Sequence, residues 1–193
     1  MLCVDLISYS APCGATSGGV SDIWIYDPSD FNFIQEKETG KGANPYSAIS
    51  LVDGATKEGG ARMFRVKFKR KEAEFNFTHS SEGCSVTYEF ELSAKLPNLS
   101  NDLTNFLSSL DAAGCCCGLG IIIFLNSGKI LVLGEKNVNS EVIPYFEVVM
   151  NGTKGGSGKT FKDFNGADVM LKGEYSRMAR EFVGGVQAII DLE

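Results

Sequence analysis

The chain has little histidine and no long apolar run. Its 193 residues include 1 histidine, His79, so the usual Cys/His zinc patterns are excluded and any Ser/His/Asp or Cys/His catalytic site would have to use it. His79 follows the strand end Phe77-Thr78, and we expect it to be a solvated turn residue. The most apolar run, Leu119–Leu125, is far shorter than the roughly 20 residues that a membrane-spanning helix needs. No basic region precedes an apolar stretch near Met1, so neither a secretory signal nor membrane association is expected.

Positive charge is also scarce, with 18 basic against 24 acidic residues and a formal net charge of −6. Tight nucleic-acid binding requires clustered positive charge. One such cluster exists, because six of the ten residues from Arg62 to Lys71 are basic. We interpret it as cross-strand pairing with acids such as Glu89 and Glu91 rather than as a nucleic-acid site, since no aromatic residues lie on its basic face.

The six cysteines do not have the spacing of a disulfide framework. Three of them are consecutive, Cys115–Cys117, and no C-x-x-C spacing occurs. We expect reduced thiols in a protein made in a cytoplasm. A metal or redox site at Cys115–Cys117 is the alternative, but a second ligand cluster is missing.

The pattern of apolar residues predicts mostly strands. Phe64, Val66 and Phe68 alternate with basic residues, and the phase then slips, which we interpret as a bulge near Arg70 in one long strand. Leu99–Leu110 has helical spacing after Pro97, with a cap at Asn98 or Ser100. The predicted strands and hairpins cover residues 23–26, 46–52, 63–78, 86–92, 120–134, 145–150, 168–174 and 187–192.

This order of elements indicates the architecture. Strands precede and follow one helix without alternating with it, so we expect a mainly β single domain over residues 1–193, an antiparallel β-sandwich or barrel carrying one α-helix. Residues 1–22 are small and turn-rich and are expected to form an arm. Residues 35–60 are rich in glycine and are expected to form a long loop, with one strand at Tyr46–Val52.

One segment matches the sequence pattern of a phosphate-binding loop. Lys154–Thr160 resembles the variant loop of partition-type ATPases, in which backbone N–H groups surround phosphates, a lysine contacts them and a hydroxyl binds magnesium. The standard spacing is broken by Thr153, and Gly166 interrupts any following helix. Few residues remain for further βαβ units. We therefore interpret the stretch as a flexible connection between two strands and expect no catalytic, cofactor or metal site.

The hairpin at Gly120–Gly134 is apolar on both faces. Residues 121–125 and 130–133 lack the alternation of a strand with one solvated face. We expect one face to pack on an opposite sheet and the other on the helix, with another subunit covering what the helix leaves exposed.

This layout resembles the tail tube (major tail) proteins of tailed bacteriophages, particularly phages that infect Bacteroidetes. The likeness spans most of the chain and includes the local sequence Gly128–Glu135. In order, the matching features are a glycine-rich arm before Ile23–Tyr26, the loop 35–60, the strands Met63–Thr78 and Val86–Leu92, the helix Leu99–Leu110, the hairpin Gly120–Gly134, the Gly/Ser loop 151–160 and the strand Asp168–Glu174.

The resemblance implies a structural virion protein rather than an enzyme. Such β-sandwich proteins assemble as hexameric rings that stack into a tube, contact other tail proteins and let DNA pass without specific binding. The loop 35–60, the arm 1–22 and a C-terminal extension at 175–193 would join successive rings. The expected location is the virion tail, after synthesis in the bacterial host cytoplasm. Another virion component or a contractile-injection or type VI-like tube protein on a similar sandwich is the alternative; a nucleotide-binding enzyme using Lys154–Thr160 is a third.

Two expectations follow for the charges. Net acidity suits a channel that must not hold DNA, because like charge repels phosphate at short range. The basic segment Arg62–Lys71 is therefore expected to face a neighbouring subunit or the outer wall rather than the channel.

Overall fold

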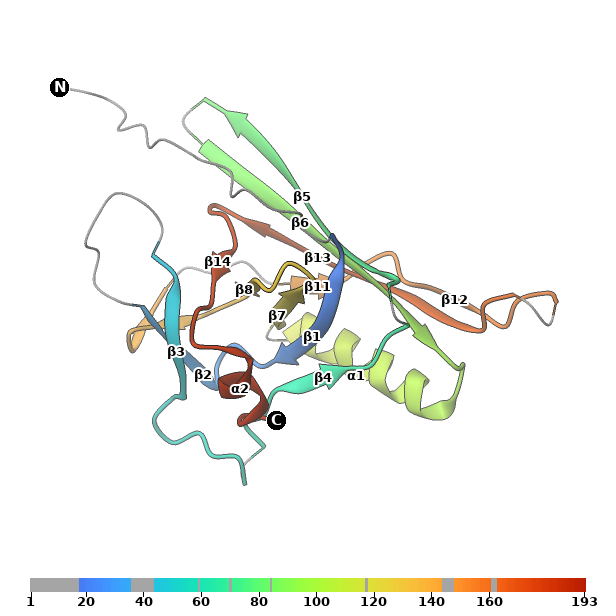
Figure 1. The fold of residues 1–193 in the computed structure, drawn as a ribbon, viewed down its shortest axis with the longest axis horizontal. Helices are drawn as coiled ribbons and strands as arrows, with labels where there is room; N and C mark the ends of the chain where they lie inside the picture. The colour runs from blue at the N-terminus through green and yellow to red at the C-terminus, as the bar shows by residue number, and fades with distance from the viewer. Residues whose placement is uncertain are drawn as a thin grey trace.

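The computed structural model describes residues 18–35, 44–58, 60–69, 71–83, 85–116, 118–143, 148–160 and 163–193. Within these residues the chain forms three β-sheets and two helices, arranged in layers (Figure 1). The predicted mainly β, sandwich-type fold is confirmed, although the sheets do not close into a barrel.

The central sheet contains the apolar hairpin. Its strand order is β14 (Arg180–Glu181), β8 (Ile130–Leu133), β7 (Gly120–Leu125), β1 (Val20–Tyr26) and β4 (Phe64–Val66). The β7–β8 turn contains Gly128, whose φ of 85° lies in the left-handed region that favours glycine. The predicted hairpin and the strand at 23–26 are thus confirmed.

Two further sheets flank the central one. The first has the order β11, β13, β6, β5, and β12 also pairs with β13. Its strands span Val148–Met150, Gly166–Tyr175, Ser85–Pro97, Ala73–Glu82 and, for β12, Lys154–Gly156. The second has the order β10, β9, β2, β3, with bounds Glu141–Val142, Asn137–Val138, Phe31–Gln35 and Tyr46–Leu51.

Each face of the central sheet borders its own core, because successive side chains of a strand point to opposite sides. Ile121 and Ile123 enter the core shared with the β11–β13–β6–β5 sheet, whereas Ile122 enters the core shared with β2 and β3. The expectation that the helix at Leu99–Leu110 covers the hairpin's second face is wrong, because Leu103 and Leu110 enter the first core instead. Ile122 is fully buried within the single chain, in a core shared with helix α2 (Val186–Ile190).

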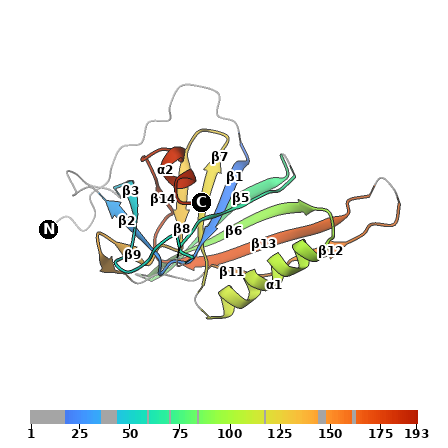
Figure 2. The same cartoon turned by 90° about the horizontal axis from the view of Figure 1, so that it is seen from below.

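The long helix α1 spans Asn101–Cys116. The Ser100 side chain accepts a hydrogen bond of 3.3 Å from the Leu103 N–H, so the predicted cap at Ser100 is confirmed. Leu103 and Leu110 enter the first core, and the helix lies alongside β11 (Figure 2). No helix in the part of the chain that the structure describes is long and apolar enough to cross a membrane.

The single bulged strand predicted at 63–78 is wrong. Its first part, β4, pairs with β1 in the central sheet, whereas β5 pairs with β6 in a flanking sheet. The chain crosses between layers in a turn where the Glu72 N–H bonds to the Lys69 carbonyl at 3.1 Å and Lys71 has a φ of 61°. The slip in apolar phase therefore marks a change of sheet.

The structure corrects two other expectations, and parts of two more fall outside the described residues. The strand predicted at 187–192 is wrong, because Val186–Ile190 is helical. His79 lies inside β5 rather than in a turn, although it is solvent-exposed as expected. The predicted arm 1–22 falls mostly outside the described residues, and positions 20–22 belong to β1. Residues 145–147 of the predicted strand 145–150 also lie outside the described residues.

Candidate assembly surface

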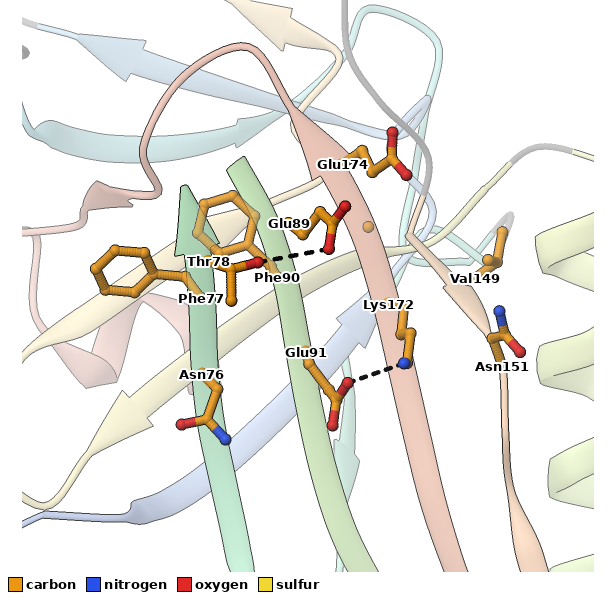
Figure 3. A pocket seen from close by; sticks show the side chains of 11 residues that line it. Asn76, Phe77, Thr78, Glu89, Phe90, Glu91, Val149, Asn151, Lys172 and Glu174 are labelled. Carbon is orange, nitrogen blue, oxygen red and sulfur yellow. Dashed lines mark hydrogen bonds and ion pairs between the residues drawn. The ribbon is translucent and has the colours of Figure 1, made fainter. Parts of the chain in front are cut away.

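The outward face of the β11–β13–β6–β5 sheet is acidic, and we call it the acidic sheet. Its centre is a shallow depression of about 520 Å³ lined by Glu89, Glu91 and Glu174, with Lys172 as the one basic lining residue (Figure 3). Lys172 Nζ lies 2.9 Å from Glu91, and Thr78 donates a hydrogen bond of 3.4 Å to Glu89. The face therefore carries net negative charge.

The strand β5 forms a long open edge of the acidic sheet. It pairs with β6 over ten residues and, among the described residues, has no strand on its other side. Soluble proteins usually protect such edges with charged side chains, especially lysine, with proline or with a bulge. β5 carries two glutamates but no lysine, proline or bulge. The terminal strands of the other two sheets span two or three residues, apart from β3, whose Tyr46 carbonyl accepts a bond from the Val183 N–H.

The register identifies the backbone groups that face outward. In an antiparallel pair, alternate residues bond to the partner strand. The Lys95 N–H bonds to the Glu72 carbonyl at 3.2 Å, so even-numbered residues of β5 bond to β6. The N–H and carbonyl groups of Phe77 and His79 consequently point to the open edge.

The tip of the β5–β6 hairpin extends beyond its neighbour. Pairing of β6 with β13 ends at Tyr88 and Tyr175, whereas β5 and β6 stay paired to Glu82 and Ser85. Figure 1 shows this projection from the body. An aromatic row continues from the core toward the tip, with the His79 and Tyr88 rings 5.3 Å apart and Phe77 50% exposed. An isolated hairpin is marginally stable in water, so this exposed row is suited to a contact.

The opposite edge of the acidic sheet is shorter and interrupted. β11 and β12 pair with β13 on either side of residues 151–153. Lys154 is exposed at this edge, opposite Asp168 in the register. The two edges thus differ in charge, because β5 carries Glu74 and Glu82 and no lysine or arginine.

The structure places Lys154–Thr160 in a hairpin, not in a strand–loop–helix unit. Residues Lys154–Gly156 form β12, which runs antiparallel to β13. The N–H groups of Lys159 and Thr160 both donate to Asp163 Oδ2 at 2.7 Å. These bonds, that to Thr160 first, lower the pKa of the Asp163 carboxyl. An internal carboxylate therefore takes the position at these amides that a phosphate would need.

The basic segment makes ion pairs different from those expected. Arg65 pairs with Asp22 of the adjacent strand β1, and Lys69 lies 2.5 Å from Glu72. Pairing with Glu89 and Glu91 is wrong, because β4 belongs to the central sheet and not to the sheet that contains these acids.

Sequence reasoning missed a buried polar cluster around Glu135. Tyr46 and Arg177 each donate a hydrogen bond of 2.7 Å to Glu135 Oε1. Burial raises the pKa of the Glu135 carboxyl, and Arg177 and Tyr46 oppose this effect. Glu135 and its partners come from three distant segments, so no local sequence pattern predicts this cluster.

The cysteines and acids give no metal centre in the part of the chain that the structure describes. There, no group of three His, Cys, Asp or Glu side chains could hold a metal ion. Cys115 is exposed near the end of α1, and Cys117 lies outside the described residues. Comparison with known proteins adds no assignment: no family model, curated protein or solved structure matches this chain.

Proposed function

We propose that this chain is a structural subunit of a bacteriophage tail tube, in which hexameric rings stack to enclose a channel for DNA. The observation that carries the proposal is the open ten-residue edge of β5 on a sheet whose outward face is acidic. A long open edge without lysine, proline or a bulge favours pairing with another strand. Such pairing between copies would supply the missing backbone partners.

The two edges of the acidic sheet favour head-to-tail pairing. Placing β5 against β5 of a second copy would bring Glu74 and Glu82 near their equivalents, and like charges repel. Placing β5 against β11 and β12 instead brings Glu74 to the edge that carries Lys154, while Glu82 lies at the hairpin tip, beyond the residues of β6 that pair with β13. Head-to-tail contacts of this kind generate rings when the rotation closes.

The charge distribution supports an acidic channel wall. Glu89, Glu91 and Glu174 share the outward face of the sheet that would form the wall. Their charge repels DNA phosphates over about 8–10 Å at physiological salt, which favours passage over binding. Arg65 belongs to the central sheet, where it pairs with Asp22, in keeping with the expectation that the basic segment avoids the channel.

A proline at the open edge tests the proposal. The purified protein is expected to form rings and tubes in negative-stain electron microscopy. His79→Pro removes an N–H that faces the edge, without removing a β5–β6 bond, and should abolish ring formation. His79→Ala keeps the N–H and is the matched control, which should still assemble. Stable monomers of the unmodified protein at high concentration would contradict the proposal.

A further inference from the structure

A second surface near the root of β5 has the opposite charge. A cleft of about 1000 Å³ is lined by Arg65, Lys67 and Lys71, with Asp22 as its one acidic lining residue. Arg65 is engaged by Asp22. Lys67 and Lys71 are exposed and have no acidic partner among the described residues. We call this surface the basic cleft.

The basic cleft also has an apolar floor. Val20 is buried there, and Val66 and Phe68 are half-buried. Lys71 holds a left-handed backbone with a φ of 61°, a conformation that costs a non-glycine residue about 1 kcal/mol or more. The cleft thus combines unpaired positive charge with accessible apolar surface, a combination suited to an acidic, partly apolar partner.

The β5–β6 hairpin tip has the complementary character. From Ala73 to Ala94 the chain contains four acids and no lysine or arginine. Glu82 lies at the last pair of the hairpin and is exposed. On the apolar side of the tip, Phe77 is 50% and Val86 39% exposed.

The tip cannot reach the basic cleft of its own chain. Lys71, which lines the cleft, lies two positions before β5, and Glu82 is the last residue of that ten-residue strand. A strand rises about 3.3 Å per residue, which separates the two surfaces by about 30 Å. A rigid paired strand lies between them, so complementary charge at its two ends can be satisfied between copies.

From this complementarity we infer that the acidic hairpin tip of one copy seats in the basic cleft of a second copy. Glu82 would approach Lys67 and Lys71, while Phe77 and Val86 would cover Val66 and Phe68. The inference rests on the proposed self-assembly and adds a second contact to it. Edge pairing closes a ring, and the tip-to-cleft contact, repeated along the strand direction, joins one ring to the next.

Charge reversal tests the contact. Glu82→Lys alone, or Lys67→Glu with Lys71→Glu, should stop tube growth in electron microscopy and leave single rings. Combining all three substitutions restores opposite charge and should restore tubes. Glu141→Lys, a reversal at an exposed residue of β10, is the matched control and should form tubes like the unmodified protein.

The outcomes separate the two proposals. If the unmodified protein forms no rings or tubes, the proposed function fails. If it forms tubes and Glu82→Lys does so equally well, or if the triple variant folds and does not recover tubes, the tip-to-cleft contact is overturned and the proposed function stands. If Lys67→Glu with Lys71→Glu lowers the melting temperature of the isolated chain without changing assembly, the cleft is filled from within its own chain, which also overturns the contact.

A salt titration gives a second measurement that needs no variant. Tube growth should weaken between about 0.05 and 0.5 M salt, because exposed charge pairs are screened. Single rings should persist through the same range, since edge pairing relies on backbone hydrogen bonds. If tube growth does not change over this range of salt concentration, the tip-to-cleft contact is contradicted.

Discussion

The Tyr46 hydroxyl donates a 2.7 Å hydrogen bond to Glu135, a carboxylate that is 1% exposed and lies 89 positions away in the chain. Arg177 approaches the same oxygen, Oε1. The other oxygen, Oε2, is buried without a hydrogen-bond partner among the described residues. A buried charge with one satisfied oxygen is costly, so this cluster links the first residue of β3 to the segment after β13 at some expense of stability.

The raised pKa of Glu135 predicts a pH dependence with a definite sign. Burial raises this pKa above 4.5 in the folded chain, so the folded state binds the proton more tightly than the unfolded state. The stability that this group contributes is present below pH 4.5 and is lost as the pH rises through the folded pKa. Glu135→Gln should remove this component and flatten the pH dependence of urea unfolding above pH 4.5. An unchanged pH profile in the variant would contradict the assignment.

Removing the partner should have a larger effect than removing the charge. Arg177→Ala leaves the Glu135 carboxylate buried without its ion pair, which typically costs about 3 kcal/mol. Adding Glu135→Gln should recover much of that loss, because no buried charge then remains. The double-mutant cycle, measured by urea unfolding at neutral pH, should give a coupling well above about 0.5 kcal/mol. Additive effects would mean that the pair does not interact.

The second face of the apolar hairpin offers a test of the single-chain core. Ile122 is fully buried, and Ile122→Ala should destabilise the monomer by about 2–5 kcal/mol, the usual cost of such a truncation. Val142→Ala, at a residue that is 72% exposed, should change stability by less than about 0.5 kcal/mol. If Ile122→Ala leaves the free energy of unfolding in denaturant unchanged, this face is not packed in the isolated chain.

The phosphate-loop interpretation of Lys154–Thr160 gives a fourth prediction. Because Asp163 accepts from the N–H groups of Lys159 and Thr160, we expect calorimetry to detect no ATP binding. Lys159→Ala should leave both that result and assembly unchanged. Binding of ATP that Lys159→Ala abolishes would contradict this interpretation.

The parts of the fold that the sequence predicted are those with local signals. Strict alternation predicted the strand at 86–92, and helical spacing with the Ser100 cap predicted α1. Val186–Ile190 has five residues, of which all but Gln187 are apolar, and so short a segment has no period that separates helix from strand. The change in apolar phase near Arg70 led to the wrong prediction, because a bulge within one strand and a crossing between two sheets produce the same pattern of apolar residues.

The candidate surfaces were less predictable because they depend on pairing. The alternation in residues 86–92 places Glu89 and Glu91 on one face of a strand. That Glu174 shares this outward face follows only from the register between β6 and β13. The open edge of β5 is likewise a property of the whole sheet order. The Glu135 cluster joins residues 42 and 89 positions from that carboxylate, and such contacts follow only once the layers are stacked.

The pairing of Tyr26 with Gly120 gives the last prediction. The two residues are directly opposite in the β1–β7 register, and a Cβ on Gly120 would lie 2.2 Å from Tyr26 Cζ. The ring therefore covers the glycine, and its hydroxyl donates a 3.1 Å bond to the Leu133 carbonyl. Gly120→Ala must displace the ring, which costs about 3 kcal/mol by the overpacking and the lost contacts.

Tyr26→Phe is the matched variant, because it removes the hydroxyl and keeps the ring over Gly120. It should cost about 1 kcal/mol, the value of one buried hydrogen bond. Combining Gly120→Ala with Tyr26→Leu should recover part of the loss in thermal unfolding, since the smaller side chain vacates the space that the new methyl group needs. If Gly120→Ala proves no more destabilising than Tyr26→Phe, the ring is not held against the strand, and the close approach of β1 and β7 at this pair is wrong.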